Sequence, residues 1–547
     1  MTANDKITGV TYAKMIAGGA ASLRAHVEEV NDLNVFPIPD GDTGENMLLT
    51  ILGGVGGCDV APENLGEAAE RVSEGMLLSA RGNSGVILSQ FFDGVAFGFG
   101  GLFEADAEHF GIAFRYGVDH AYKSVMTPTE GTILTVLREA TEVACKSGAE
   151  SVGEFLNVFL REAKASLART PDLLDVLKKA GVVDSGGAGL CYIVDGMSRA
   201  LSGEKMETDI PVSQSTQEID YDTFDEDSVL EFGYCTELLL RLQNAKTNVD
   251  VFETGVITDY LSSIGDSIVA VQNGSVVKIH VHTMTPDKVL SFCQKYGEFL
   301  KVKIENMSLQ HNSIPTSKRT SEATAERKAF GVVAVASGEG LVNTFIERGA
   351  DVVVSGGQSM NPSAEDFIET FDKVNADTIF VLPNNGNIVL TAKQAAELYK
   401  VSDVRVIESK TIGDGYAALS MLDTDSGDAD RIAEEMTEAM QGVVTAEISH
   451  CVRDANMDGT ELHAGDYIGF MGKTLLAWGE SRLAAVCETL ERLRFSQYDF
   501  CILIRGKDTP SEETARIEAY VNARYKNKEI YIIDGEQEVY DYILILQ

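Results

Sequence analysis

The stretch NVFPIPDGDTGENM, residues 34–47, joins a loop rich in proline and glycine directly to an amphipathic segment. Proline and glycine fix the backbone path there, so Asp40 and Asp42 stand in a rigid loop and not in a helix. Two carboxylates separated by one glycine suit a hard cation such as Mg2+, which also takes water and phosphate oxygens. A plain surface turn explains the same residues, because Asp-Gly is common in turns.

The segment after this loop belongs to a region of helices. Up to about residue 202, apolar residues recur at helical spacing, as in TYAKMIAGGAASLRAHVEEV (11–30) and GTILTVLREATEVACK (131–146). The breaks between the helical segments all combine glycine with polar residues: DGDTGEN (40–46), ARGNSG (80–85), TPTEGT (127–132) and VVDSGGAG (182–189). We expect these four helix entrances to gather at one end of a helical domain.

The residues at the four helix entrances suit phosphate. Helix starts offer N–H groups and a partial positive charge, and small or hydroxyl-bearing residues let phosphate oxygens approach them. Plain N-capping by the same asparagine, serine or aspartate side chains is the alternative. The candidates are Asn83, Ser84, Gly85, Thr132, Asp184, Gly186 and Gly187.

The pattern changes after the helical region, which we place at 1–203. Residues 204–227 are polar and acidic, which indicates a linker. Residues 228–310 combine strand patterns with a helix pattern, which predicts a small α/β domain with a hairpin turn at Asn273–Gly274. A second polar linker, 311–328, precedes a region, 329–547, that begins with alternating strands and helices as in parallel βαβ units and ends in strands.

Three residues of the middle domain form another constellation. His280 and His282 are two apart on a predicted strand, so both lie on one face, and Cys235 belongs to another predicted strand. Two imidazoles and a thiolate suit Zn2+ with one open position. An aid to phosphoryl transfer, a dimer contact and a purely structural role all remain open for the same residues.

Two asparagine-rich stretches follow predicted strands in the last region, SGGQSMNPS (355–363) and LPNNGNI (382–388). They are expected at the carboxyl ends of a parallel sheet, where α/β domains place ligands. Asn361, Asn384 and Asn385 shape these loops, either to dock a partner or simply to close the turns.

Composition limits the functions that remain. The chain of 547 residues carries a net charge of -39, which repels phosphate backbones and argues against nucleic acid as a partner. The eight cysteines are scattered without a C-x-x-C pair, which is typical of cytoplasmic proteins. No apolar run suits a membrane span, so at most a peripheral membrane contact is expected, and no signal peptide is visible. No P-loop or kinase lysine motif occurs.

The motifs resemble one family over nearly the whole chain. NVFPIPDGDTGENM, ARGNSGVILSQ, EGTILTV and VVDSGGAGL resemble the nucleotide-binding signatures of the DhaL domain of dihydroxyacetone kinases. They resemble still more closely those of the ATP-binding subunit of bacterial fatty acid kinase. FGYCTELLLR, VKIHVHT, VSGGQSMNPS and LPNNGNI resemble its middle and DegV-like C-terminal domains. The implied fold is an all-α helical barrel, a small α/β middle domain, and an α/β domain with a parallel sheet.

The resemblance also implies an activity. The family uses ATP and Mg2+ to phosphorylate the carboxylate of a fatty acid held by a separate fatty-acid-binding protein, giving an acyl phosphate for phospholipid synthesis. A homodimer is a further expectation for the family. The DhaL signature includes a third aspartate before the pair, for which LNVFPIP offers only Asn34 or Asp32. The resemblance implies that Asp40 and Asp42 hold Mg2+, with Thr43 and Asn46 beside them. It implies that Asn83, Ser84 and Gly85 bind phosphate. Thr132 and Asp184 are then expected to line the nucleotide pocket.

Two other functions remain as alternatives. The chain can be a lipid carrier or scaffold that senses nucleotide without kinase activity. It can also be a subunit of a dihydroxyacetone kinase, although no evident domain would bind that ketone covalently through histidine.

Overall fold

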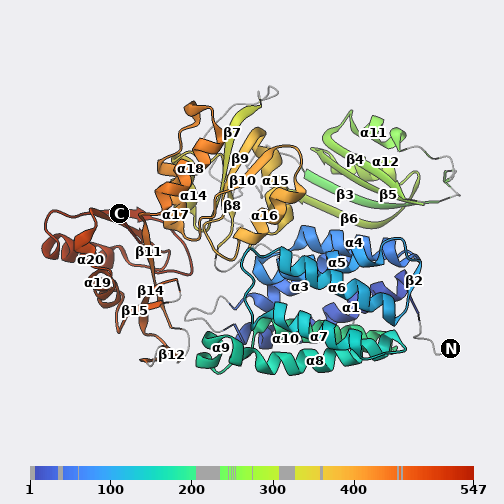
Figure 1. Cartoon of the computed structure of the whole chain (residues 1–547). Coiled ribbons are helices and arrows are strands. Elements are labelled where there is room, and N and C mark those ends of the chain that lie inside the picture. Colours follow the sequence, from blue (N-terminus) through green and yellow to red (C-terminus); the bar gives the residue numbers. More distant parts are fainter. Residues whose placement is uncertain are drawn as a thin grey trace. The chain divides into compact units, whose positions relative to one another are not determined.

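A computed structural model gives the architecture of the chain (Figure 1). It describes residues 6–34, 41–58, 61–204, 234–243, 246–247, 249, 252, 254–273, 275–306, 327–357, 361–451, 455–457, 460–472 and 474–547. The chain forms two compact units. One unit combines Met1–Ile210 with Glu326–Gln547, and the other is Pro211–Ala325.

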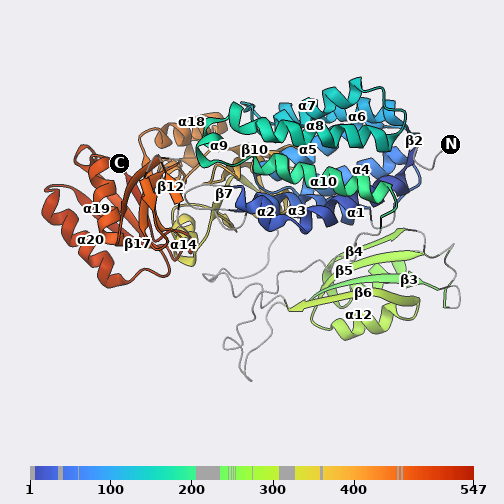
Figure 2. The ribbon, with the colours of Figure 1, turned by 90° about the horizontal axis from the view of Figure 1, so that it is seen from below.

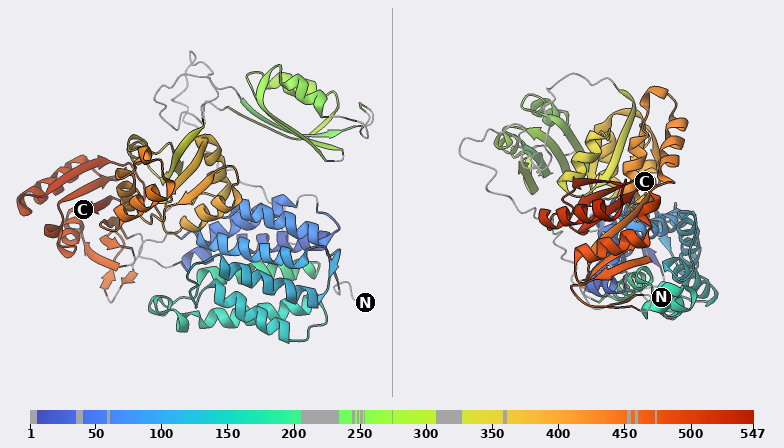
Figure 3. Two further views of the ribbon diagram at one scale, coloured as in Figure 1. Left: turned by 45° about the horizontal axis from the view of Figure 1, so that its top comes forward. Right: turned by 90° about the vertical axis from the view of Figure 1, so that its left-hand side faces the viewer.

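The first part of the larger unit is helical, as the apolar spacing predicts. Its long helices run side by side (Figures 1 and 3). The sequence patterns did not predict a short antiparallel ribbon, which pairs β1 (Ile7–Thr8) with β2 (Glu104–Ala105). The helices are α1 (Gly9–Arg24), α2 (Val27–Asp32), α3 (Thr43–Gly57), α4 (Leu65–Ser79), α5 (Gly82–Phe99), α6 (Ala107–Lys123), α7 (Ile133–Lys146), α8 (Val152–Leu173), α9 (Asp175–Ala180) and α10 (Ser185–Leu201).

One continuous apolar core holds these helices together. In α7 the buried positions Ile133, Val136, Leu137 and Ala140 follow the helical period, which directs one face inward. Phe114 meets Phe91, Phe155 and Phe159 edge-on with ring centroids 5.3 to 5.4 Å apart, an arrangement that aromatic rings favour. Close helix contacts at glycines complete the packing. A Cβ on Gly18 of α1 would lie 2.7 Å from the carbonyl oxygen of Gly196 of α10.

The smaller unit is an antiparallel sheet with two short helices. β4 and β5 pair antiparallel as the predicted hairpin requires, although Gly274 of its turn lies outside the described residues. The strand order is β4-β5-β3-β6 among the described residues. The elements are β3 (Tyr234–Leu242), α11 (Gly255–Leu261), β4 (Gly265–Asn273), β5 (Val276–Thr283), α12 (Pro286–Cys293) and β6 (Gly297–Asn306).

The C-terminal part of the larger unit begins with the predicted parallel sheet, of order β10-β9-β7-β8. Residues of β7 point alternately to two cores, so α14, α17 and α18 cover one face and α15 and α16 cover the other. The elements are β7 (Lys328–Ala336), α14 (Glu339–Glu347), β8 (Val352–Ser355), α15 (Ala364–Val374), β9 (Ala376–Leu382), α16 (Val389–Leu398), β10 (Asp403–Val406), α17 (Ile412–Ser420) and α18 (Ala429–Met440).

A mixed sheet of order β15-β14-β11-β18-β16-β17 completes the chain, with a short β12–β13 ribbon beside it. Helices α19 and α20 cover one face (Figure 2), while Ile543 and Ile545 of the other face join the core under α14 and α17. The elements are β11 (Val444–His450), β12 (Ala455–Met457), β13 (Thr460–Leu462), β14 (Tyr467–Met471), β15 (Thr474–Gly479), α19 (Arg482–Arg492), β16 (Phe500–Arg505), α20 (Ser511–Arg524), β17 (Glu529–Asp534) and β18 (Tyr542–Leu546).

Among the described residues, none of the helices combines the length and the apolar character that a membrane span requires.

Candidate nucleotide and metal site

The four helix entrances lie against one another at one end of the helical part. The Ser185 hydroxyl at the start of α10 donates to the Thr43 hydroxyl at the start of α3 over 3.3 Å. A Cβ on Gly186 would lie 3.3 Å from the Cβ of Ile133, the first residue of α7. A Cβ on Gly82, where α5 begins, would lie 2.7 Å from Asn46 Nδ2. The expected gathering of the entrances is therefore found.

At three of these entrances the N-cap residue does not cap its own helix. The residues at the N-cap positions of α3, α5 and α7 are Asp42, Arg81 and Thr132, and none accepts a hydrogen bond from its own first turn. Plain capping by Asn83 or Ser84 is not found, because both lie inside α5. Side chains from other segments bond two of these starts, because Gly44 N of α3 donates to Asn31 Oδ1 over 2.7 Å and Ile133 N of α7 donates to the Asp184 carboxylate. The start of α5 therefore offers the N–H groups and partial charge that bind anions.

The fourth entrance is capped, because Asp184 accepts a hydrogen bond from Gly187 N over 2.7 Å. Burial raises the pKa of Asp184 to about 6, and the N–H groups of Gly187 and Ile133 oppose that shift. Desolvation disfavours the ionised carboxylate, while hydrogen bonds to it favour it. Asp184 is thus a carboxyl group that changes charge just below neutral pH.

Asp42 precedes α3, but its carboxylate is directed to another part of the chain. Its Oδ2 accepts a hydrogen bond from Asn361 Nδ2 over 2.6 Å, and Asn361 lies in the loop between β8 and α15. Asn361 is only 3% exposed, and its Oδ1 is buried with no hydrogen-bond partner in the described part of the chain. Asn46, a further expected neighbour of the metal, is also buried.

These residues fit a magnesium site. Asp40 lies outside the described residues, so the predicted pair of carboxylates stays a prediction. Within the described ranges, no three acidic, histidine or cysteine side chains form a metal-binding group. Mg2+ needs only one or two carboxylates, since water and phosphate oxygens complete its octahedral shell. The Asp42 carboxylate and the unpartnered Asn361 oxygen therefore fit a hydrated Mg2+ bound to phosphates.

Arg81 and Asn361 are the site residues that sequence reasoning missed. Arg81 Nη1 donates to the Asn361 carbonyl over 2.7 Å, and its Nη2 lies 3.5 Å from Asp366 Oδ2. Arg81 is the one basic residue of the ARGNSG motif. A positive charge within a predicted phosphate-binding motif could have identified it as a site residue. Nothing local marks Asn361, because its partners lie 280 and 319 residues away along the chain.

The other asparagines of the same sheet edge have local roles. Asn384 adopts a positive φ of 55°, and its Nδ2 donates to the Val335 carbonyl over 2.9 Å. Asn385 Oδ1 accepts a hydrogen bond from Asn387 N over 2.8 Å. Asn387 Oδ1 in turn accepts one from Asn83 Nδ2 over 3.2 Å. The expectation that Asn384 and Asn385 shape loops agrees with these contacts.

The middle-domain constellation is defined at the level of the backbone. The strand register pairs Cys235 with His282, and Glu237 with His280, on neighbouring strands. The side chains of Cys235, His280 and His282 lie outside the described residues. Their zinc site therefore stays a prediction.

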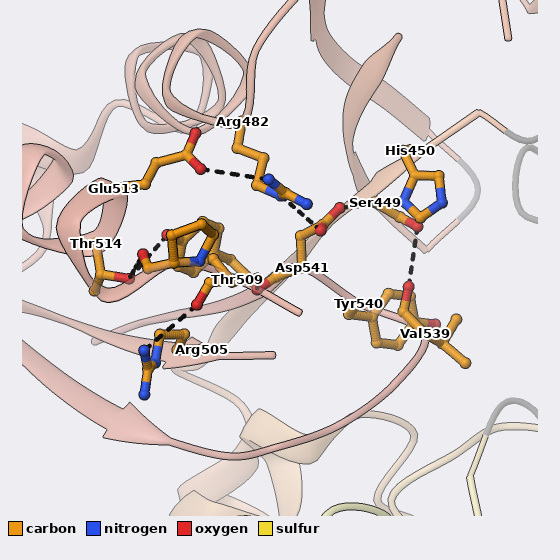
Figure 4. Close-up of polar contacts among 12 residues, drawn as sticks. Ser449, His450, Arg482, Arg505, Thr509, Glu513, Thr514, Val539, Tyr540 and Asp541 are labelled. Atoms are coloured by element: carbon orange, nitrogen blue, oxygen red, sulfur yellow. Dashed lines mark hydrogen bonds and ion pairs between the residues drawn. The ribbon is translucent and has the colours of Figure 1, made fainter. Parts of the chain in front are cut away.

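Two further polar groups lie in the C-terminal part. Asp541 accepts a hydrogen bond from Arg482 Nε over 2.7 Å, and Glu513 lies 3.4 Å from the same guanidinium (Figure 4). This buried ion pair joins β18 to α19 and α20. Glu447 lines a cavity of about 60 Å³, and its Oε2 is buried with no hydrogen-bond partner among the described residues. Burial, helped by the charge of Asp414, raises the pKa of Glu447 to about 8.

Family models divide the chain in the same way. Residues 37–199 match the DAK2 domain. Residues 231–314 match the middle domain of FakA-like fatty acid kinase proteins, and residues 331–547 match the C-terminal domain of the same proteins. The matches define a multidomain protein with a helical DAK2 domain followed by FakA-like middle and C-terminal domains.

Two relatives match over nearly the whole chain. Protein YloV of Bacillus subtilis is 38% identical, over 98% of this chain and 99% of the relative. The uncharacterized protein SSP1546 of Staphylococcus saprophyticus is 36% identical, over 99% of this chain and 100% of the relative. The chain belongs to the FakA-like family of fatty acid kinase proteins.

Solved structures give fainter likenesses. The dihydroxyacetone kinase from C. freundii in complex with AMP-PNP and Mg2+ matches with a TM-score of 0.28 and 18% identity, over 36% of this chain and 34% of that one. A DegV family protein from Thermus thermophilus, described as binding fatty acid, matches with a TM-score of 0.30 and 12% identity. The match covers 40% of this chain and 99% of that one.

Proposed function

We propose that this protein is the ATP-binding subunit of a fatty acid kinase. It transfers the γ-phosphoryl group of ATP to the carboxylate of a fatty acid held by a separate fatty-acid-binding protein. Family membership supports the substrate. The observation that carries the nucleotide site is the convergence of the helix starts beside Asp42, among which α5 has no side-chain cap. The acyl phosphate formed serves phospholipid synthesis.

The reaction asks the protein for positioning and charge neutralisation. A carboxylate oxygen of the fatty acid bonds to the γ-phosphorus while the bond from that phosphorus to the β–γ bridging oxygen breaks, so that ADP leaves. An ionised carboxylate has no proton to lose, so the step needs no general base. The first turns of α3 and α5 offer N–H groups to the phosphates, and Arg81 adds positive charge beside them. Bound Mg2+ supplies the remaining neutralisation of the phosphoryl oxygens.

We propose individual roles for the residues of the helix entrances. Asp42, together with Asp40, holds Mg2+, and Thr43 and Asn46 support that loop. The remaining residues of the helix entrances contact the nucleotide: Asn83, Ser84, Gly85, Thr132, Asp184, Gly186 and Gly187.

The other regions receive supporting roles. Residues 1–203 bind nucleotide, residues 228–310 form the middle domain, and residues 329–547 dock the fatty-acid-binding protein, with linkers at 204–227 and 311–328. Cys235, His280 and His282 bind Zn2+ or assist the transfer. We place the protein in the cytoplasm, as a homodimer.

The test is ATP turnover by the full-length protein with a fatty-acid-loaded carrier, an unloaded carrier and no carrier. We expect ADP formation only with the loaded carrier, together with an acyl phosphate that hydroxylamine traps as a hydroxamate. The isosteric variant Asp42→Asn is the matched control and should release neither product. Turnover with dihydroxyacetone alone would indicate a dihydroxyacetone kinase. Nucleotide binding without transfer to any acceptor would indicate a sensing scaffold.

A further inference from the structure

A segment of the C-terminal part, residues 361–366, lies directly on the start of α5. Ala364 N donates to the Ala80 carbonyl over 3.3 Å, and Ser363 forms an antiparallel bridge with Arg81. The Arg81 guanidinium reaches the Asn361 carbonyl and the Asp366 carboxylate. The ARGNSG entrance is thus hydrogen-bonded through both backbone and side chain to a segment far along the sequence.

This segment has a fixed shape before any ligand arrives. Ser363 and Asp366 form a capping box at the start of α15: Asp366 N donates to Ser363 Oγ over 3.1 Å, and Ser363 N donates to Asp366 Oδ2 over 2.7 Å. A capping box fixes the path by which the chain enters a helix. The position of Asn361, two residues earlier, therefore follows from the fold of the C-terminal part.

Only the amide nitrogen of the Asn361 side chain forms a hydrogen bond to a described residue. Its Nδ2 donates to Asp42 Oδ2 over 2.6 Å, whereas its Oδ1 is buried and makes no hydrogen bond to any described residue. Buried acceptors without a donor are uncommon and unfavourable, which points to a donor that is absent from the bare chain. The lack of a side chain at Gly82 makes room for this amide, because a Cβ there would lie 3.2 Å from Asn361 Nδ2.

We propose that Asn361 is a positioning residue of the magnesium–nucleotide site. Its amide N–H groups hold the Asp42 carboxylate so that the other carboxylate oxygen faces the metal, and its Oδ1 accepts a hydrogen bond from a hydration water of the ion. Groups that orient metal-binding carboxylates tune metal affinity in this way. The inference rests on the proposed nucleotide site and adds that the site is shared between the helical and C-terminal parts.

One consequence is coupling between the two parts. If Mg2+–nucleotide binds more tightly when residues 361–366 are in place, then nucleotide must by the same factor stabilise that placement. A partner that docks on the C-terminal part and displaces the segment would weaken nucleotide binding. One that reinforces the segment would strengthen it.

The test compares nucleotide affinity of full-length variants by calorimetry, with Mg2+ and with excess EDTA. We expect Asn361→Ala to weaken binding of Mg2+–ATP about tenfold and to leave metal-free ATP binding within about twofold. Gln394→Ala is the matched control. Gln394 Nε2 donates to the Leu77 carbonyl over 2.6 Å at the same interface, but the residue does not contact Asp42. This control should leave both affinities unchanged.

Three results would overturn the proposal: an Asn361→Ala affinity equal to the native one, a tighter one, or an equal loss in Gln394→Ala. Amide hydrogen exchange in the native protein provides a test that does not depend on a variant folding. Mg2+–ATP should slow exchange across residues 361–366, and metal-free ATP should not. If the native protein bound no nucleotide at all, the proposed function itself would fail. If it bound nucleotide and exchange across the segment were unaffected by Mg2+, only the role of Asn361 would fall.

Discussion

The hydroxyls of Thr43 and Ser185 lie 3.3 Å apart, although 142 residues of sequence separate them. Each is the first residue of its helix, and each directly follows an aspartate, Asp42 or Asp184. The contact therefore joins the entrance proposed to bind metal to the entrance whose aspartate has a raised pKa. The proposed function depends on this convergence of helix starts.

Gly82 tests how closely the second entrance approaches the metal side of the site. Its φ of +57° strains any other residue, and a Cβ would lie 2.7 Å from Asn46 Nδ2. We expect Gly82→Ala to weaken Mg2+–ATP binding about tenfold or more, measured by calorimetry. Gly101→Ala is the control. Gly101 has a φ of +76°, but a Cβ there would have no atom of the described residues within 4 Å. An equal loss in both variants would show that backbone strain, and not the site, is responsible.

Asp184 predicts a pH dependence of stability. Its pKa of about 6 lies above the unfolded value of 3.8, so the folded state holds the extra proton between those values. The contribution of Asp184 to stability is then fully present below about pH 4 and is lost as the pH rises through about 6. We expect Asp184→Asn, which keeps an acceptor for Gly187, to raise the thermal midpoint relative to the native protein at pH 7.5 but not at pH 4.

Asp106 gives the opposite control for this experiment. It caps α6, and although burial raises its pKa, the hydrogen bonds and charge of His109 lower it below its ordinary value. Asp106→Asn should therefore lower the thermal midpoint at neutral pH and matter little at low pH. Circular dichroism at 222 nm reports on both helices. A rise with Asp106→Asn at pH 7.5, or no rise with Asp184→Asn, would contradict the assignment.

Glu447 predicts a second pH effect in the C-terminal part. Its pKa of about 8 lies above its ordinary 4.5, so its stabilising contribution is lost as the pH rises through about 8. Glu447→Gln removes the buried charge and should raise the unfolding midpoint by roughly 5 °C at pH 9, with little difference near pH 5. The sole tryptophan, Trp478, lies in the same sheet and reports unfolding by fluorescence. A midpoint difference that did not depend on pH would refute the raised pKa.

The middle-domain prediction is tested by metal content. If Cys235, His280 and His282 bind Zn2+, the purified full-length protein should contain about one zinc per chain after dialysis, and His282→Ala should contain none. Thr283→Ser, a conservative change next to it on the same strand, should retain the metal. If the native protein contained no zinc, or if the zinc content were unchanged in His282→Ala, the zinc site would be refuted. Cys235, His280 and His282 would then have a structural role or a role in phosphoryl transfer.

The local parts of the architecture could be predicted from sequence. Apolar residues at helical spacing placed the helices of the first region, and alternating strand and helix patterns placed the parallel sheet. Glycine and polar residues at the breaks identified all four entrances, because a helix start depends on residues that are adjacent in sequence. The ribbon of β1 with β2 could not be predicted, because two residues a side are too few to show a period.

Long-range pairing within the site could not be predicted either. Asn361 contacts Asp42 from 319 residues away, and Arg81 pairs with Ser363 through the backbone. No local pattern specifies such partners, because any exposed asparagine in a loop after a strand has the same sequence signature. Asn361 was accordingly expected to shape a loop for a partner, whereas the structure places its side chain against the proposed metal-binding aspartate.

Calorimetric titration of the native full-length protein with ATP, with and without Mg2+, tests the central claim most directly. We expect single-site binding that is much tighter with Mg2+ than without it, and that the affinity with Mg2+ falls about a hundredfold or more in Asp42→Asn. This change keeps the size of the side chain and should leave the thermal midpoint nearly unchanged. Binding of equal strength by folded Asp42→Asn, or no binding by the native protein, would contradict a metal–nucleotide site at the helix entrances.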